Sequence, residues 1–150
     1  MKVLEATDFY YPWIAGPSPF IRNLSGGLAE RGHDVVVACP SPTGKPFDES
    51  GAECLHRVRT WPIPFGYNLR AGFPFFDLSR LVTQWEPDVV HISSLFEGYV
   101  DVSVSSVKEL GTNTITAVTL YDLIPFLNPD KYLTDAGFKK HYYGKIEALN

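Results

Sequence analysis

The residues that follow the first predicted strand are of types that could contact a ligand. From Asp8 to the start of the first predicted helix at Pro19, the stretch "DFYYPWIAGPSP" carries four aromatic residues, three prolines and a glycine. A connection that serves only geometry needs about two to six residues, commonly small and polar ones. This loop is longer and bulkier, so we predict that it contacts a ligand.

Two further segments carry polar and aromatic residues directly after predicted strands. His91 to Gly98, "HISSLFEG", follows one apolar run, and Tyr121 to Pro125, "YDLIP", follows another. Tyrosine and histidine side chains at such positions can hydrogen-bond to a polar substrate. Together with Asp8 to Ser18, these segments form the candidate site if the fold brings them together.

No spacing in the sequence predicts a metal site. The two cysteines lack the paired spacing of metal ligands, and we predict that both are buried free thiols: Cys39 and Cys54. The four histidines are scattered, with no helical spacing that places two on one face: His33, His56, His91 and His141. We therefore expect neither a metal nor a cofactor.

The composition is that of a soluble globular domain. Hydrophobic residues make up 45% and charged residues 20% of the 150 residues, which excludes a disordered chain and fits one domain with a single core. The net charge of -4 and the lack of a basic run argue against nucleic acid as a partner. The first residues lack the apolar core of a signal peptide, and no segment is long enough to span a membrane, so we expect a cytoplasmic location.

Apolar runs and helical periodicities alternate along the chain. Strands are predicted at 2–7, 34–40, 53–61, 87–93 and 113–122, and helices at 19–31, 77–85, 99–110 and 131–150. The turn-rich stretches 41–52 and 62–76 are predicted to be loops. For the first helix we expect Ser18 as the N-cap, Pro19 as the first helical residue and Gly27 at a close contact with the sheet.

This order of elements predicts an α/β fold of the Rossmann type, with a doubly wound and mainly parallel sheet. In such sheets, ligands bind beyond the carboxyl ends of the strands. The three candidate segments follow the first, fourth and fifth predicted strands. We therefore expect them to share one rim.

Three stretches together resemble the N-terminal domain of GT-B fold glycosyltransferases of family 4. They are "DFYYPWIAGPSPFIRNLSGGLAERGHDVVVACP", "EPDVVHISS" and "VTLYDLIPFLNPDKYL". The most specific part is the first strand, a loop with proline and glycine, and a helix that ends in "LAERGHDV". The resemblance covers nearly the whole chain, and it implies one Rossmann-like half of an enzyme that moves a sugar from a nucleotide-sugar donor.

The resemblance also implies roles for particular residues. The family commonly has a Gly-Gly pair after the first strand, where backbone amides approach the donor phosphate or the acceptor; here the pair is Ala15-Gly16. A His-Asp pair near the transferred sugar corresponds to Tyr121-Asp122, and tyrosine donates a hydrogen bond but does not shuttle protons near neutral pH. Glu97 either faces the same cleft or is a solvated acid at a helix start. The implied catalytic residues are Tyr121, Asp122 and Glu97, and the implied donor- or acceptor-binding residues are Trp13, Ala15, Gly16, Pro17, Ser18 and His91.

The resemblance further implies partners. A GT-B enzyme closes its site between two Rossmann-like domains, and the C-terminal domain supplies most donor contacts. The sequence shows no second domain, so we expect residues 1–150 to be the acceptor-side domain, with the donor-binding domain absent and little activity alone. The implied partners are that domain, a nucleotide-sugar donor and a glycan or lipid-linked acceptor. Because many relatives use lipid-linked acceptors, peripheral association with the inner face of the membrane is a further expectation.

Several alternatives stay open at this point. The domain could be a nucleotide- or phosphate-binding module, or an inactive scaffold whose exposed interdomain face makes it a homo-oligomer. The aromatic residues of 61–76 either border the acceptor or pack beneath a long loop. Residues 1–92 and 93–150 resemble different branches of the family, the second mannosyltransferase-like. A chimera joined near Ile92 and Ser93 is therefore a further hypothesis.

Overall fold

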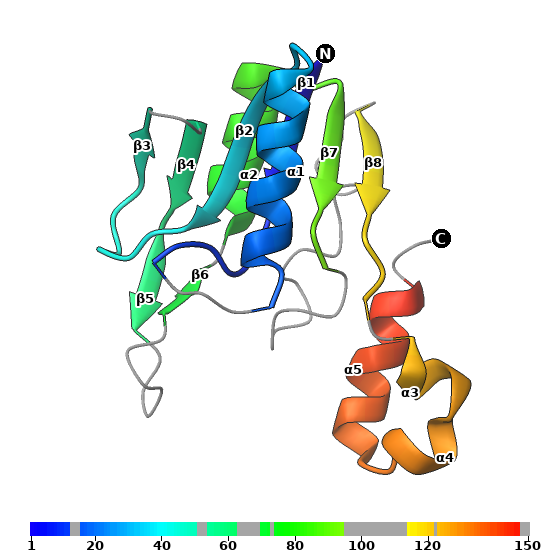
Figure 1. The fold of residues 1–150 in the computed structure, drawn as a ribbon. Helices are drawn as coiled ribbons and strands as arrows, with labels where there is room; N and C mark the ends of the chain where they lie inside the picture. The colour runs from blue at the N-terminus through cyan, green and yellow to red at the C-terminus, as the bar shows by residue number, and fades with distance from the viewer. Residues whose placement is uncertain are drawn as a thin grey trace.

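A computed structural model of the chain describes residues 1–12, 16–50, 54–62, 70–72, 74–94, 114–121 and 123–147 (Figure 1). Within these ranges, six strands form one sheet in the order β3-β4-β2-β1-β7-β8. Their bounds are β1 Lys2–Ala6, β2 Asp34–Pro40, β3 Phe47–Glu49, β4 Cys54–Val58, β7 Val89–Ile92 and β8 Ile115–Val118. Every neighbouring pair is parallel except β3 with β4. The predicted Rossmann-like α/β fold is confirmed.

Two helices cover opposite faces of this sheet. Helix α1, Ser18–Glu30, lies across one face, and α2, Pro74–Trp85, lies across the other (Figure 1). Three helices follow β8 beyond its carboxyl end: α3 Ile124–Leu127, α4 Pro129–Tyr132 and α5 Ala136–Glu147. None of the helices in the described ranges is long and apolar enough to cross a membrane.

The register of the central strands places the carboxyl ends of three strands at one edge of the sheet. Strand β1 lies between β2 and β7, with Leu4 opposite Val36 on one side and Val90 on the other. Strand β8 continues the parallel order, with Ile92 opposite Val118. The carboxyl ends of β1, β7 and β8 therefore meet at one rim, as the sequence predicts.

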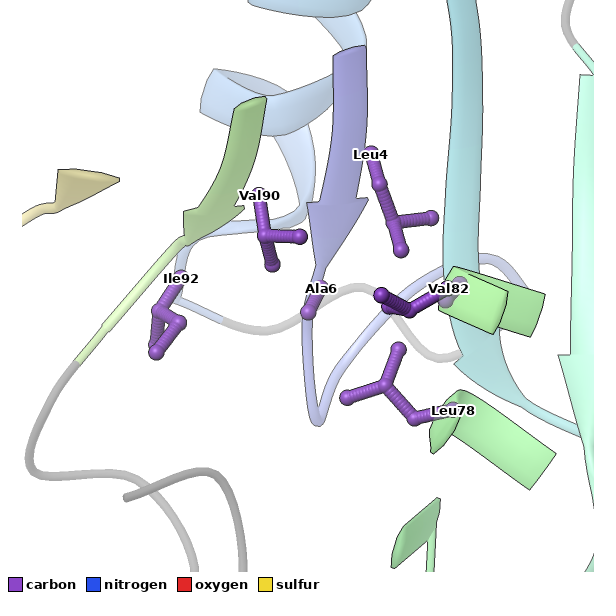
Figure 2. Close-up of a cluster of buried hydrophobic side chains, with 7 residues drawn as sticks. Leu4, Ala6, Leu78, Val82, Val90 and Ile92 are labelled. Atoms are coloured by element: carbon purple, nitrogen blue, oxygen red, sulfur yellow. The ribbon is translucent and has the colours of Figure 1, made fainter. Parts of the chain in front are cut away.

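Alternate residues of the same strands supply the two faces. Leu4 and Ala6 of β1 and Val90 and Ile92 of β7 form an apolar cluster with α2 on one face, and Figure 2 shows the α2 side chains Leu78 and Val82 directed toward them. Burying each large aliphatic side chain contributes about 1.5–3 kcal/mol to stability. The intervening residues face α1, where a second cluster consists of Tyr10, Ile21, Val37 and Cys39. The core is thus two layers, one on each side of the sheet.

Three short strands lie where the sequence predicts loops or one long strand. Strand β3 falls in 41–52, and β5, Thr60–Pro62, pairs with β6, Arg70–Gly72, which falls in 62–76. The predicted strand 53–61 is therefore divided into β4 and β5. These loop predictions were wrong because three-residue strands are held by their neighbours and are too short to show an alternating pattern.

The helix boundaries also differ from the predictions. The predicted helix 131–150 is α4 and α5, separated at Leu133 to Asp135, because the Asp135 side chain caps a new helix: its Oδ1 accepts the Phe138 N–H at 2.7 Å. At α1, Pro17 rather than Ser18 is the N-cap, and no side chain caps the helix. The predicted helix 99–110 lies outside the described residues.

Two further expectations about single residues were wrong. Gly27 does not lie at a close contact with the sheet. A Cβ on Gly27 would instead meet the Arg31 guanidinium at 3.3 Å, because Arg31 donates a hydrogen bond to the Gly27 carbonyl of its own helix. Cys39 is buried, but Cys54 is exposed because it begins β4 at the amino end of the strand.

Candidate functional site

The candidate site is the rim at the carboxyl ends of β1, β7 and β8. Gly16, Pro17 and Ser18 lie at the start of α1, and Gly16 has φ 42°, a left-handed conformation that favours glycine. Pro17 and Ser18 are buried, whereas Gly16 is exposed. Four of the predicted site residues lie outside the described residues: Trp13, Ala15, Glu97 and Asp122.

The start of α1 has few backbone donors. Pro17 and Pro19 carry no N–H, and the Ile21 N–H donates to the Pro17 carbonyl at 2.9 Å. The backbone N–H groups that precede it in this turn are therefore those of Gly16, Ser18 and Phe20. The first turn holds no acidic residue, so the positive end of the helix dipole is not neutralised by its own side chains. This end of α1 suits an anionic or hydroxyl-bearing ligand.

The structure brings Tyr121 to the same helix end. The rings of Phe20 and Tyr121 make an edge-to-face contact, with centroids 5.8 Å apart and an interplanar angle of 89°. The Tyr121 side chain is exposed. The segment after β8 thus contacts the first turn of α1, which directly follows the predicted loop segment.

His91 lies inside β7, within the predicted strand 87–93 and at the start of the predicted segment His91 to Gly98. Its Nδ1 is hydrogen-bonded to the carboxylate oxygen Oε2 of Glu5, and its Nε2 lies 2.7 Å from Oγ1 of Thr119. Both ring nitrogens therefore have protein partners. His91 is the middle member of a chain of three side chains across β1, β7 and the end of β8.

The sequence predicted no role for Glu5 or Thr119, the other two members of this hydrogen-bonded series. The Glu5 side chain is fully buried, and its second oxygen, Oε1, has no hydrogen-bond partner among the described residues. A buried carboxylate of this kind is unusual and calls for an explanation. One signal was available: Glu5 is the charged residue in the otherwise apolar run "VLEA".

A second carboxylate at the rim, that of Asp8, is enclosed within reach of the charge of Lys145. Asp8 follows β1, and its Oδ2 is enclosed without a hydrogen-bond partner in the described part of the chain. Burial raises the pKa of Asp8 from 3.8 to about 6, although the positive charge of Lys145 acts in the opposite direction. Lys145 itself is buried in α5. Helix α5 thus reaches back to the loop after β1, which no sequence pattern indicates.

Packing explains two of the aromatic residues in the loop after β1. Tyr10 is buried in the core on the α1 side, and the guanidinium of Arg22 lies 5.2 Å from the ring centroid of Tyr11. The buried Arg57 donates from Nη1 to the Tyr11 carbonyl at 2.7 Å and from Nε to Glu49. These contacts hold the loop against β2 and β4. The described part of the chain contains no group of three or more potential metal ligands.

Comparison with known proteins identifies the family. The chain matches Glycosyltransferase Family 4 over residues 14–129, and it belongs to that family. It is 37% identical to a serotype-specific mannosyltransferase WbdA of Escherichia coli over 60 residues, which are 40% of this chain and 7% of that protein. It is 29% identical to a GDP-mannose-dependent alpha-mannosyltransferase of Mycobacterium tuberculosis over 100 residues, 63% of this chain and 26% of that protein.

A third relative is a glycogen synthase of Mycobacterium tuberculosis, 33% identical over 115 residues, which are 61% of this chain and 27% of that protein. The chain therefore spans about a quarter of the length of two of these relatives and less of the first. The family match includes the start of α1, the segment after β7 and the segment after β8.

Proposed function

We propose that this chain is the acceptor-side, N-terminal domain of a GT-B enzyme that transfers a sugar from a nucleotide-sugar donor to a glycan or lipid-linked acceptor. The family match over residues 14–129 carries this proposal, because it includes the end of the loop after β1 and the segments after β7 and β8 that the fold rule selects. The contact between Phe20 and Tyr121 supports it, since it joins the first turn of α1 to the segment after β8.

The geometry supports distinct roles at this rim. Backbone amides near Gly16 and Ser18 lie at the positive end of α1, where they would stabilise charge that develops on the departing diphosphate. The hydroxyl of Tyr121, an exposed residue, would donate a hydrogen bond to the sugar. Roles for Trp13, Ala15, Asp122 and Glu97 in the same cleft belong to the proposal as well.

The proposed partner is a second, donor-binding domain. The chain spans about a quarter of the mannosyltransferase and glycogen synthase relatives, so a complete site would use residues that this chain does not hold. Without that domain, the rim faces water, where each hydrogen bond to a ligand contributes little. The chain alone is therefore proposed to have little activity.

The names of the relatives suggest which donor to test first. One relative is described as GDP-mannose-dependent, and WbdA is described as a mannosyltransferase. We therefore propose GDP-mannose as the first donor and other GDP-, UDP- and ADP-sugars as comparisons. No cofactor is proposed.

The test joins this chain to a C-terminal donor-binding domain of the same family and measures sugar transfer to glycan and lipid-linked acceptors. Transfer above the background of donor hydrolysis supports the proposal, and replacing Tyr121 by alanine should lower it. His33→Ala is a control, because His33 lies just before β2 at the amino ends of the strands. Saturable binding of NAD without a response to any sugar nucleotide would instead favour a dinucleotide-binding module.

A second candidate function is association through an apolar surface. Between the end of β8 and the first turn of α5, eight large hydrophobic residues are exposed: Leu120, Tyr121, Leu123, Ile124, Phe126, Leu127, Tyr132 and Phe138. Such a concentration favours contact with a second copy of this chain. Size-exclusion chromatography across a range of concentrations tests this self-association. A separate experiment, co-sedimentation with anionic vesicles, tests the proposed peripheral membrane association. A monomer at every concentration excludes self-association.

The chimera also remains a proposal. The proposed junction near Ile92 and Ser93 falls at the carboxyl end of β7. Separate sequence searches with residues 1–92 and 93–150 test it: if both pieces retrieve the same natural proteins as their nearest relatives, the two parts were not joined from different branches.

A further inference from the structure

Glu5, His91 and Thr119 connect the interior of the sheet to its rim. Glu5 is in β1, His91 is in the neighbouring β7, and Thr119 directly follows β8. The backbone of Thr119 is fixed as well, because its N–H donates to the Ile92 carbonyl at 2.9 Å. The backbone that carries the Thr119 hydroxyl is thus fixed by two adjacent strands.

The direction of these hydrogen bonds follows from the protonation states of Glu5 and His91. With Glu5 ionised, its carboxylate only accepts hydrogen bonds, and the Nδ1 of His91 then carries the proton toward it. In the neutral imidazole, Nε2 is then an acceptor, and the Thr119 hydroxyl donates to it across 2.7 Å. The hydroxyl proton of Thr119 therefore points inward. Its oxygen keeps lone pairs that can accept a hydrogen bond from elsewhere.

Exposure decreases from Thr119 inward. Thr119 is half-buried, the His91 side chain is 12% exposed, and Glu5 is fully buried. Two residues further on, Tyr121 is exposed and contacts the start of α1. Thr119 is the member of the chain that a ligand at the rim could reach.

Stability alone does not account for the hydrogen-bonded series of Glu5, His91 and Thr119. Taking a carboxylate out of water is costly, even where a neighbouring side chain donates a hydrogen bond to it. The same two strands achieve apolar packing on their other face, with Leu4 and Val90. Burying Glu5 with one oxygen unpartnered in the described structure therefore points to a role in orienting its neighbours.

We propose that Glu5, His91 and Thr119 form a positioning relay that presents the Thr119 oxygen as a hydrogen-bond acceptor for a sugar hydroxyl at the rim. Glu5 selects the tautomer of His91, His91 directs the Thr119 proton inward, and Thr119 accepts from the ligand. The identity of the ligand rests on the proposed function, whereas the relay itself does not. The sugar hydroxyl belongs either to the donor or to the acceptor.

The relay is tested in this 150-residue chain by ¹⁵N NMR of the histidine rings. The expected spectrum shows His91 as the Nδ1–H tautomer, and its Nε2 signal shifts in Thr119→Val but not in Thr119→Ser. Serine keeps the hydroxyl, whereas valine keeps the branched shape without it, so the pair separates hydrogen bonding from packing. An Nε2–H tautomer in the unsubstituted chain overturns the relay.

The ligand contact is tested with the same two substitutions in the chain joined to a C-terminal donor-binding domain. Losing one hydrogen bond to a sugar hydroxyl should raise KM in Thr119→Val by about five- to tenfold, with kcat little changed, and Thr119→Ser should stay within about twofold. A rise in KM for the donor assigns the hydroxyl to the donor, and a rise for the acceptor assigns it to the acceptor. A loss of folded protein would lower kcat instead.

Unchanged KM values in Thr119→Val, or equal values in both variants, overturn the ligand contact. If the unsubstituted enzyme transfers no sugar from any sugar nucleotide, the proposed function fails and the ligand contact is overturned with it. The tautomer measurement distinguishes that outcome from a failure of the relay, since it needs neither ligand nor activity.

Discussion

On the α2 face of the sheet, β1 and β7 contribute Leu4, Ala6, Val90 and Ile92 to an apolar layer, and on the α1 face the intervening positions hold Glu5 and His91. The backbone pairing is the same for both sets, since Leu4 lies opposite Val90 and Glu5 lies opposite His91. The same pair of strands therefore has two different roles. Apolar residues on one face stabilise the strands, while polar residues on the other connect the interior to the rim.

The two faces should therefore respond differently to substitution. The apolar face loses stability in proportion to the volume removed, and each residue contributes largely on its own. On the polar face, removing one partner leaves the other buried without compensation, so the effects of Glu5 and His91 should be coupled.

The largest expected effect is on the polar face. His91→Leu leaves the Glu5 carboxylate buried without its partner and should lower the free energy of unfolding by about 3–5 kcal/mol. Replacing both residues, Glu5→Leu with His91→Leu, should recover most of this loss, because no buried charge remains. Urea denaturation of the three chains measures the coupling. If the double substitution is as destabilising as the sum of the single ones, the two residues are not coupled as described.

The next effect tests the apolar face. Leu4 is fully buried, so Leu4→Ala should lower the free energy of unfolding by about 2–5 kcal/mol through lost burial and the cavity left behind. Ile115→Ala is the matched control, since Ile115 is a strand residue that is 67% exposed, and it should change stability by about 0.5 kcal/mol or less. Equal losses in urea denaturation would contradict the proposed core.

A smaller effect concerns the buried carboxyl group at the rim. The pKa of Asp8 is raised from 3.8 to about 6, so between these values the folded chain binds the proton more tightly than the unfolded chain. This contribution to stability is fully present below about pH 4 and is lost as the pH rises through about 6. Asp8→Asn should remove it and should make the chain relatively more stable at pH 7 to 8.

The measurement is the difference in free energy of unfolding between the unsubstituted chain and Asp8→Asn from pH 4 to 8. Asp130→Asn, on the exposed surface of α4, is the control for removing one acidic residue. A difference that does not vary across this range would show that Asp8 is not buried as described.

The smallest expected effect concerns the rates at which the two cysteine thiols react. Cys39 is buried on the α1 face, whereas Cys54 is exposed at the start of β4, so a thiol reagent should label one cysteine rapidly in the folded chain. Cys54→Ser should abolish the rapid phase and change stability by less than about 0.5 kcal/mol. Rapid labelling of both thiols would contradict the burial of Cys39.

The parts of the fold with strong periodicity could be predicted from the sequence. The unbroken apolar run at 34–40 and the helical spacing of Ile21 and Leu28 are local patterns, and both elements lie where expected. The β5 and β6 pairing and the capping of α5 by Asp135 depend on residues that meet only in the folded chain or on one side-chain contact. Such features leave little periodic signal.

The candidate site likewise has one part that the sequence predicts and another part that it does not. The rule for parallel sheets identified the three rim segments, because it depends only on the order of strands. Glu5 could not be assigned from sequence, since its importance lies in its register with His91. The approach of Lys145 to Asp8 depends on the return of α5 toward the loop after β1, which no local pattern encodes.

The central claim is that the rim at the carboxyl ends of β1, β7 and β8 is part of a sugar-transfer site. The most direct test measures transfer from a panel of sugar nucleotides, beginning with GDP-mannose, by this chain joined to a C-terminal donor-binding domain. We predict transfer that falls sharply in Tyr121→Ala and is unchanged in His33→Ala, at the opposite edge of the sheet. Absence of transfer from every donor, or equal activity in both variants, would contradict the account.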